Sequence, residues 1–178
     1  GYGADVKTMQ QTLINKFHTK GINVLVAAFG ATDYPTGEDP TQVCTNLAQF
    51  VINNNLDGVD LDFEDSAAFN ANGDGEKWLI TCTQVLRKYL PEDQYILTHA
   101  PQGPYFTTDA LYPQGSYLKI DREVGNLINW YNLQYYNQGA NTYVSYQDLV
   151  VACSAFPGPA LLELMNLKAK QGVVVGKP

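Results

Sequence analysis

Segments of helical periodicity alternate with short apolar segments along this chain, and no other feature of the sequence constrains its fold as strongly. For example, INVLVAAF at 22–29 is a continuous apolar run, as expected of a parallel strand that is buried on both faces. The pattern predicts strands at 22–29, 56–64, 94–100, 128–137 and 173–178. It predicts helices at 4–20, 41–54, 75–90, 145–154 and 158–172. Strands that alternate with helices in this way form βαβ units and a parallel sheet.

Two α/β architectures contain such units, an open doubly wound sheet and a (β/α)8 TIM barrel. The first strand-to-helix loop has no GxGxxG or P-loop motif, which disfavours a nucleotide-binding sheet. The loops after the strands are long, polar and aromatic, as in the catalytic rim of a barrel. A complete barrel typically has about 250 residues, whereas this chain has 178. We therefore expect residues 1–178 to form a single domain, an α/β barrel that is incomplete at both ends.

The segment LDGVDLDFE at 56–64 alternates acidic with apolar side chains. Because successive side chains of a strand point to opposite faces, Asp60, Asp62 and Glu64 share one face, with neighbours about 6.5–7 Å apart. Like charges at this spacing, partly desolvated, retain at least one proton at neutral pH. Glu64, at the carboxyl end of the strand, is best placed to meet a substrate as a general acid. Two alternatives stay open: the acids cap a helix or pair with Lys and Arg, or they bind a divalent metal ion.

The predicted strand at 128–137 has a polar face of its own. Asn132, Gln134 and Tyr136 fall on one face, and the opposite face carries tyrosine and leucine. A polar row beside an apolar row is typical of a strand whose inner face ends in a site. Tyr136 taken alone could also be an ordinary core tyrosine.

Charge and hydropathy exclude some partners. The formal net charge is -7, and the 11 Lys and Arg residues are scattered, which argues against nucleic acid. No apolar segment reaches the roughly 20 residues of a membrane span. We expect neither nucleic acid nor membrane as a partner, no metal, no cofactor, and a monomer. No leader sequence begins the chain, so that any signal peptide lies outside it.

The three cysteines have no metal-binding spacing. We favour buried free thiols at Cys44, Cys82 and Cys153. A bridge between Cys44 and Cys82, on neighbouring helices, is the alternative.

The segment 56–64 matches the DGxDxDxE motif of glycoside hydrolase family 18 at every position, and the chain resembles that family in four further segments. These segments are VLVAAFG at 24–30, YILTHAPQGPYF at 95–106, NLQYYNQ at 132–138 and VVVGKP at 173–178. They resemble the third, fifth, sixth and seventh strands of the family's barrel. In character the match is nearest to the fungal secreted subgroup, which is related to plant class III chitinases. The resemblance implies that about strands 3–7 and their helices are present.

The resemblance also implies catalytic roles. Glu64 would protonate the glycosidic oxygen and later activate water, and Asp62 would orient and stabilise the N-acetyl group of the substrate. Asp60 would lie behind Asp62, and Tyr136 would donate a hydrogen bond to the N-acetyl carbonyl. In this family the substrate supplies the nucleophile, so that no second protein nucleophile is needed.

Four further residues are candidates for substrate binding by the same resemblance. Gln134 and Asn137 would line the sugar subsite, and Gln102 and Tyr105 follow the fifth-strand segment. Loop aromatics such as Tyr105 could stack on a sugar, or could equally pack the loop against the scaffold.

The implied activity is endo-hydrolysis of β-1,4-linked N-acetylglucosamine, in chitin or in the chitobiose core of N-glycans, by an extracellular enzyme. It would proceed with retention through an oxazolinium intermediate. Two alternatives are a chitinase-like lectin that binds such sugars without cleaving them, and an inactive truncated barrel. An intact Glu64 favours the enzyme.

Overall fold

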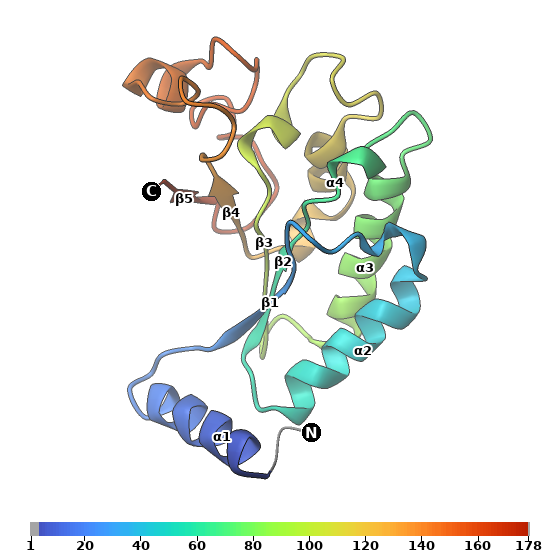
Figure 1. Ribbon diagram of the computed structural model, residues 1–178, viewed down its shortest axis with the longest axis vertical. Coiled ribbons are helices and arrows are strands. Elements are labelled where there is room, and N and C mark those ends of the chain that lie inside the picture. Colours follow the sequence, from blue (N-terminus) through green and yellow to red (C-terminus); the bar gives the residue numbers. More distant parts are fainter. Residues whose placement is uncertain (1–3, 178) are drawn as a thin grey trace.

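Five parallel strands form one sheet in a computed structural model that describes residues 4–177 (Figure 1). The strands are β1 (Leu25–Phe29), β2 (Gly58–Asp62), β3 (Ile96–His99), β4 (Trp130–Gln134) and β5 (Val173–Gly176). They lie in the order β1-β2-β3-β4-β5, and every neighbouring pair is parallel. The predicted parallel α/β fold is therefore confirmed. Among the described residues the sheet does not close on itself, so that β1 and β5 are its two edges.

Four α-helices accompany the sheet, with bounds α1 (Ala4–His18), α2 (Pro40–Asn53), α3 (Asp74–Tyr89) and α4 (Ser116–Val124). The helices α2, α3 and α4 lie on one side of the sheet, and α1 lies apart from them (Figure 1). Helix α2 starts where the sequence favours it, because Asp39 accepts a hydrogen bond from the Thr41 amide and proline occupies the first turn. Helix α3 ends with Arg87 and Lys88 in its last turn, where cations stabilise a helix.

The hydrophobic core lies between the sheet and these helices. Val59, Leu61 and Phe63 are 0% exposed and point towards the helices. Tyr131 and Leu133 of β4 also point towards the helices, and their side chains are 0% exposed. Because side chains alternate along a strand, the residues between them are turned to the opposite, more open face of the sheet.

Two segments differ from the sequence prediction. Helix α4 was not predicted, although Tyr117, Ile120 and Val124 are buried at helical spacing. The predicted helix at 158–172 is wrong, since this segment forms turns before β5. Some of its backbone amides form isolated turns, and others donate to distant groups. Leu161 donates to the Leu149 carbonyl.

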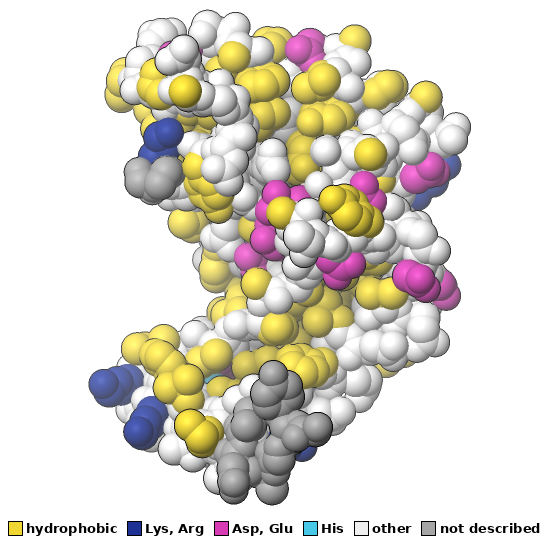
Figure 2. All heavy atoms as spheres, viewed as in Figure 1, with side chains coloured by type: hydrophobic (Ala, Val, Ile, Leu, Met, Phe, Trp, Pro, Cys, Tyr) yellow, Lys and Arg dark blue, Asp and Glu magenta, His cyan; other side chains and the backbone are white. Residues whose placement is uncertain are grey.

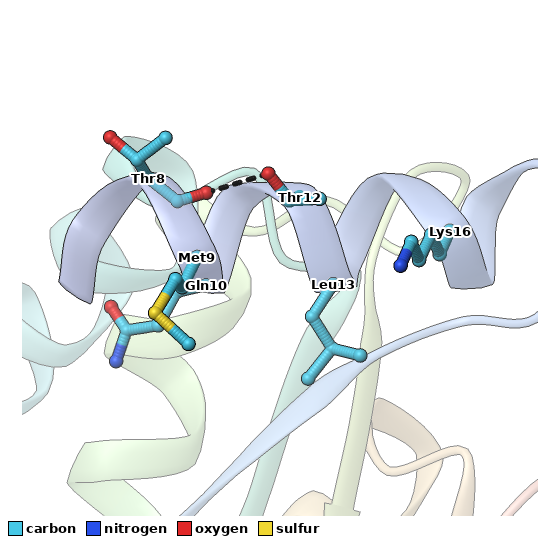
Figure 3. Close-up of a pocket in the computed structure, with 6 residues that line it drawn as sticks. All are labelled: Thr8, Met9, Gln10, Thr12, Leu13 and Lys16. Carbon is cyan, nitrogen blue, oxygen red and sulfur yellow. Dashed lines mark hydrogen bonds between the residues drawn. The ribbon is translucent and has the colours of Figure 1, made fainter. Parts of the chain in front are cut away.

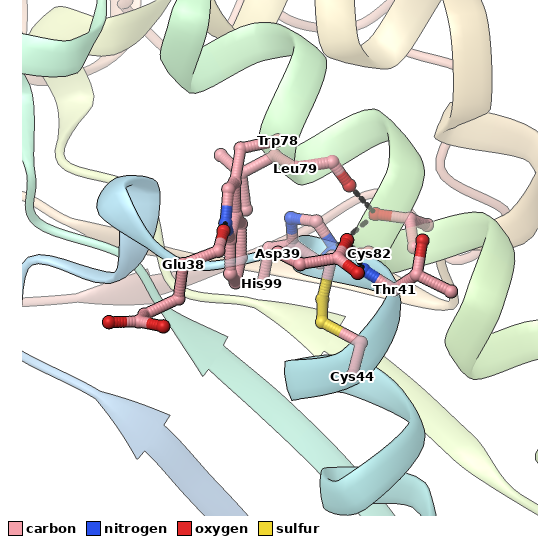
Figure 4. Close-up of a disulfide and its surroundings, with 9 residues drawn as sticks. Glu38, Asp39, Thr41, Cys44, Trp78, Leu79, Cys82 and His99 are labelled. Atoms are coloured by element: carbon pink, nitrogen blue, oxygen red, sulfur yellow. Dashed lines mark hydrogen bonds between the residues drawn. A yellow bond between two sulfur atoms is a disulfide. The ribbon is translucent and has the colours of Figure 1, made fainter.

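The prediction of free thiols is wrong for two cysteines. Cys44 of α2 and Cys82 of α3 form a disulfide, with 5.4 Å between their Cα atoms (Figure 4). The helices lie against each other and turn both thiols into the same buried layer, a juxtaposition that sequence spacing does not reveal. Cys153 is free and buried, as predicted.

An apolar pocket of about 560 Å³ lies along α1. Figure 3 shows Met9 and Leu13 on this side of the helix, and their side chains are 70% and 55% exposed. The pocket shares no residue with the acidic face of the sheet. No helix in the described part of the chain has the length and apolar character that crossing a membrane requires.

Candidate active site

Three carboxylates form a row that begins in β2 and continues beyond it. Asp60 and Asp62 belong to the strand, and Glu64 lies two residues past its end. All three side chains are half-buried, whereas Leu61 and Phe63 between them are 0% exposed. The predicted separation of acidic and apolar residues onto two faces is thus confirmed. Figure 2 shows acidic side chains gathered near the middle of the molecule, at the level of the sheet.

Asp60 is held from two neighbouring strands. Thr98 of β3, its register partner, donates from Oγ1 to Asp60 Oδ1. Asn132 of β4 donates from Nδ2 to the same oxygen at 3.0 Å. Asn132 is held in turn by Trp130, whose Nε1 donates to Asn132 Oδ1 at 2.9 Å. Asp60 therefore accepts two hydrogen bonds, which fix its carboxyl group against β3 and β4.

Asp62 is the carboxyl group whose acidity the site changes most clearly. Burial, the charge of Glu64 and the charge of Asp60 raise the pKa of Asp62 to about 6. Gln134 opposes this effect, because its Nε2 donates to Asp62 Oδ1 at 2.7 Å and stabilises the anion. Gln134 also donates to the Ala100 carbonyl at 2.7 Å, which fixes its amide. Asp62 can therefore exchange a proton near neutral pH.

Glu64 contacts the loop after β3. Gln102 donates from Nε2 to Glu64 Oε2 at 3.0 Å. The backbone of Gln102 forms a parallel bridge with Gln134, so that the loop is anchored to β4. Gln102 is therefore placed beside the acid, where it orients the carboxyl group.

A pocket of about 280 Å³ lies over Asp60 and Asp62, and Glu64 is not among its lining residues. Its walls come from β2, β4, β5 and the end of β3. The lining residues are Asp60, Asp62, Ala100, Asn132, Leu133, Gln134, Tyr136, Val174 and Gly176. Tyr136 is half-buried, and burial and the three acids raise its pKa above the usual value of tyrosine. Its hydroxyl group therefore keeps its proton at neutral pH and can donate a hydrogen bond.

Three predicted binding residues do not line this pocket, namely Tyr105, Asn137 and Gln102, the last of which contacts Glu64. Tyr105 is 1% exposed and packs its ring against Phe69, Tyr112 and Tyr117, so that it cannot stack on a sugar in this arrangement. Asn137 is exposed just after Tyr136 and does not line the pocket. An aromatic or polar residue in a loop gives no sequence signal for the direction in which it points.

Sequence analysis did not assign site roles to Thr98 or Asn132. Both lie on the inner face of a strand at the level of Asp60. The available signal was the alternation of side chains along the strand. It predicts the face of the sheet on which Thr98 lies, but not the group to which Thr98 is hydrogen-bonded.

The alternatives to an acid–base site require ion-pair partners or further metal ligands beside the acids of the row. The two ion pairs in the described part of the chain join His18 with Asp57 and Lys170 with Glu92. Neither pair includes an acid of the row. Within residues 4–177, no group of three or more His, Cys, Asp and Glu side chains has the arrangement of a metal site.

The chain resembles solved structures of family 18 glycoside hydrolases. A family 18 chitinase from Pseudoalteromonas aurantia has 32% sequence identity and a TM-score of 0.79, over 93% of this chain and 60% of that one. A fungal family 18 endo-β-N-acetylglucosaminidase has 20% identity and a TM-score of 0.56, over 72% of this chain and 46% of that one. A family 18 chitinase from Chromobacterium violaceum has 20% identity and a TM-score of 0.60, over 79% and 39%.

At 20% identity, the last two similarities show the fold alone. The chain spans about three fifths or less of the length of these structures. No protein-family model matches the chain, and no curated protein matches it. The neighbours support a part of the family 18 barrel and do not support the fungal subgroup that the sequence motifs predict.

Proposed function

We propose that this chain carries the acid–base centre of a family 18 glycoside hydrolase that cleaves β-1,4-linked N-acetylglucosamine with retention of configuration. One observation carries the proposal. Asp60 and Asp62 line a pocket together with Gln134 of β4 and Tyr136 just after it, and Glu64 continues the same row of acids two residues past β2. The row holds an exchangeable proton near neutral pH, because burial and neighbouring charge raise the pKa of Asp62 to about 6.

In the proposed first step, Glu64 donates a proton to the glycosidic oxygen as the bond to the anomeric carbon breaks. The carbonyl oxygen of the substrate's own N-acetyl group attacks the anomeric carbon and forms an oxazolinium ion. Asp62 stabilises the positive charge on this group, and Tyr136 donates a hydrogen bond to the carbonyl oxygen while it attacks. Asp60 keeps the row negatively charged behind Asp62.

In the second step, Glu64 removes a proton from water, and the water oxygen attacks the anomeric carbon. The oxazolinium ring opens and restores the N-acetyl group. Two inversions at one carbon give net retention. Gln102, which donates to Glu64, steadies the carboxylate between its two roles.

The substrate class follows from this mechanism, because only a sugar with a 2-acetamido group can supply the nucleophile. Chitin and the chitobiose core of N-glycans share that chemistry. The fungal subgroup rests on the sequence motifs alone. An extracellular location is supported by the disulfide between Cys44 and Cys82, since such bonds persist mainly in oxidising compartments.

The decisive experiment compares wild-type protein with Glu64→Gln on chitotetraose and on an N-glycopeptide. Cleavage by the wild type should fall by about a thousandfold or more in Glu64→Gln, since the proton donor is lost. Glu123→Gln is the matched control, because Glu123 is an exposed carboxylate of α4, and it should retain full activity. NMR of the first product should show the β-anomer.

Three results would contradict the proposal. Binding of chitotetraose without cleavage by the wild type would identify a lectin. Neither binding nor cleavage would indicate an inactive barrel segment. Equal activity in Glu64→Gln would show that another group is the acid. Cleavage of chitotetraose would indicate chitin as the substrate, whereas cleavage of the glycopeptide would indicate the chitobiose core of N-glycans.

A further inference from the structure

The amide of Asn132 has all its hydrogen-bonding groups engaged within the protein. Its Nδ2 donates to Asp60 Oδ1 at 3.0 Å and to Thr98 Oγ1 at 3.4 Å. Its Oδ1 accepts from Trp130 Nε1 at 2.9 Å. Asn132 lines the pocket, and both its NH2 group and its oxygen have partners within the protein.

Trp130 fixes the direction in which this amide points. An indole N–H can only donate, so that the amide atom facing it must be the oxygen. The NH2 group is then directed towards Asp60. If Trp130 could not donate, the amide could rotate by half a turn and place its oxygen against the carboxylate. The indole therefore selects the orientation that stabilises the Asp60 anion.

The surroundings of Asp60 make this donor important. Asp62 and Glu64 lie above it on the same face, Tyr136 faces it across the pocket, and the hydroxyl of Tyr117 interacts with it electrostatically from α4. None of these groups is a cation, and the residue of β1 in register with Asp60 is an alanine. Hydrogen bonds from neutral groups, and no counter-ion, hold the Asp60 carboxylate.

We propose that Asn132, oriented by Trp130, is a positioning residue that holds the Asp60 carboxyl group in place beneath Asp62. The position of Asp60 matters because its charge favours retention of a proton at Asp62. Asn132 acts on the reaction through Asp60 and does not touch the substrate. The catalytic consequence rests on the proposed hydrolase function, whereas the effect on the carboxylates does not.

The test uses Asn132→Ala and Trp130→Phe, of which the second removes one N–H group and keeps an aromatic ring. Trp78→Phe is the matched control, because Trp78 also donates its indole N–H, to the Glu38 carbonyl at 3.0 Å, but lies on the opposite side of β2. Carbon-13 NMR of the aspartate carboxyl groups follows the titration of Asp62 in each protein, and circular dichroism confirms folding. Initial rates on chitotetraose give kcat and KM.

In Asn132→Ala, Asp60 loses a donor and is free to move away from Asp62, so that the titration midpoint of Asp62 should fall by about half a pH unit, less than the shift of one to three units caused by a charge at contact distance. Trp130→Phe should shift it in the same direction by less, and Trp78→Phe should leave it unchanged. In Asn132→Ala, kcat should fall about tenfold, as expected from loss of one hydrogen bond to a charged group, with KM changed less than about twofold.

An unchanged Asp62 midpoint in folded Asn132→Ala or Trp130→Phe would overturn the inference, as would an equal shift in Trp78→Phe. A rise in KM with constant kcat would overturn it too, because it would make Asn132 a substrate-binding residue. If the wild type cleaves no sugar, the proposed function fails, and the NMR titration still decides the inference.

Discussion

His99 gives the protein a calculable sensitivity to acid. Its side chain is 0% exposed, with Nε2 at 3.3 Å from Thr83 Oγ1 and Nδ1 at 3.2 Å from the Tyr117 hydroxyl. Burial, and to a lesser degree the charge of Arg87, lower the pKa of His99 to about 3. The folded protein therefore keeps this imidazole neutral, whereas an unfolded chain protonates it near its usual pKa of about 6.5.

The direction in which pH changes the stability follows from the number of protons that each state binds. Below the unfolded pKa, the unfolded state binds a proton that the folded state does not, so that acid favours unfolding. Between about pH 7.5 and about pH 4.5, this single group should remove about 3 kcal/mol from the free energy of unfolding, at about 1.36 kcal/mol per pH unit below 6.5. The loss levels off only near the folded pKa of about 3.

The perturbation that isolates this effect is His99→Gln, which removes the titrating ring. Urea unfolding, followed by tryptophan fluorescence with the disulfide intact, gives the free energy of unfolding of both proteins across this pH range. Lost packing lowers the stability of the variant equally at each pH. The difference in the free energy of unfolding between wild type and variant should therefore shrink by about 3 kcal/mol from the neutral to the acidic end.

Tyr117→Phe is the control, because it removes the hydroxyl partner of the ring and keeps the imidazole. It should lower stability and retain the pH dependence of the wild type. A wild-type-minus-His99→Gln difference that stays constant within about 0.5 kcal/mol over this range would refute a buried neutral histidine.

Two further predictions concern the disulfide and the acidic row. Replacing both Cys44 and Cys82 by Ala should lower the free energy of unfolding by up to about 4 kcal/mol, as the loop-entropy relation gives for a separation of 38 residues. Urea unfolding measures this loss. An unchanged midpoint would show that the disulfide does not stabilise the protein. Gln134→Met should raise the pKa of Asp62 above its value of about 6, because the amide that stabilises the anion is removed; carbon-13 NMR would show the shift as about one pH unit, and a fall would contradict the role of Gln134.

The faces of the strands could be predicted from the sequence because they depend on a local rule. Alternation along 56–64 placed Asp60 and Asp62 opposite Leu61, and the structure has that arrangement. The same rule grouped Asn132 with Gln134, and both now donate to the acidic row. The pairing of particular donors with particular acids depends on strand register, which one sequence does not state.

The misses have non-local causes. The apolar pattern at 158–172 fits a helix, but amides of this segment are bound by other segments; for example, Lys168 N lies 2.9 Å from Asp121 Oδ2. Gln102 reaches Glu64 from a loop whose course is set by its bridge to Gln134. Contacts between segments 30 or more residues apart decide both outcomes, and periodicity carries no information about them.

The hydrogen-bond donors of the acidic row link its carboxyl groups to neighbouring strands and still leave them able to take up a proton. Asp60 accepts from Asn132, Asp62 from Gln134 and Glu64 from Gln102, so that each acid has one amide donor from β4 or from the loop after β3. A lysine or arginine in these places would hold each carboxylate ionised far below neutral pH. An amide carries no net charge and cannot titrate, and it orients a carboxylate without removing its capacity to take up a proton. Among the described residues no ion pair involves the row, so that burial and mutual repulsion keep a proton available near neutral pH, as the proposed hydrolysis requires.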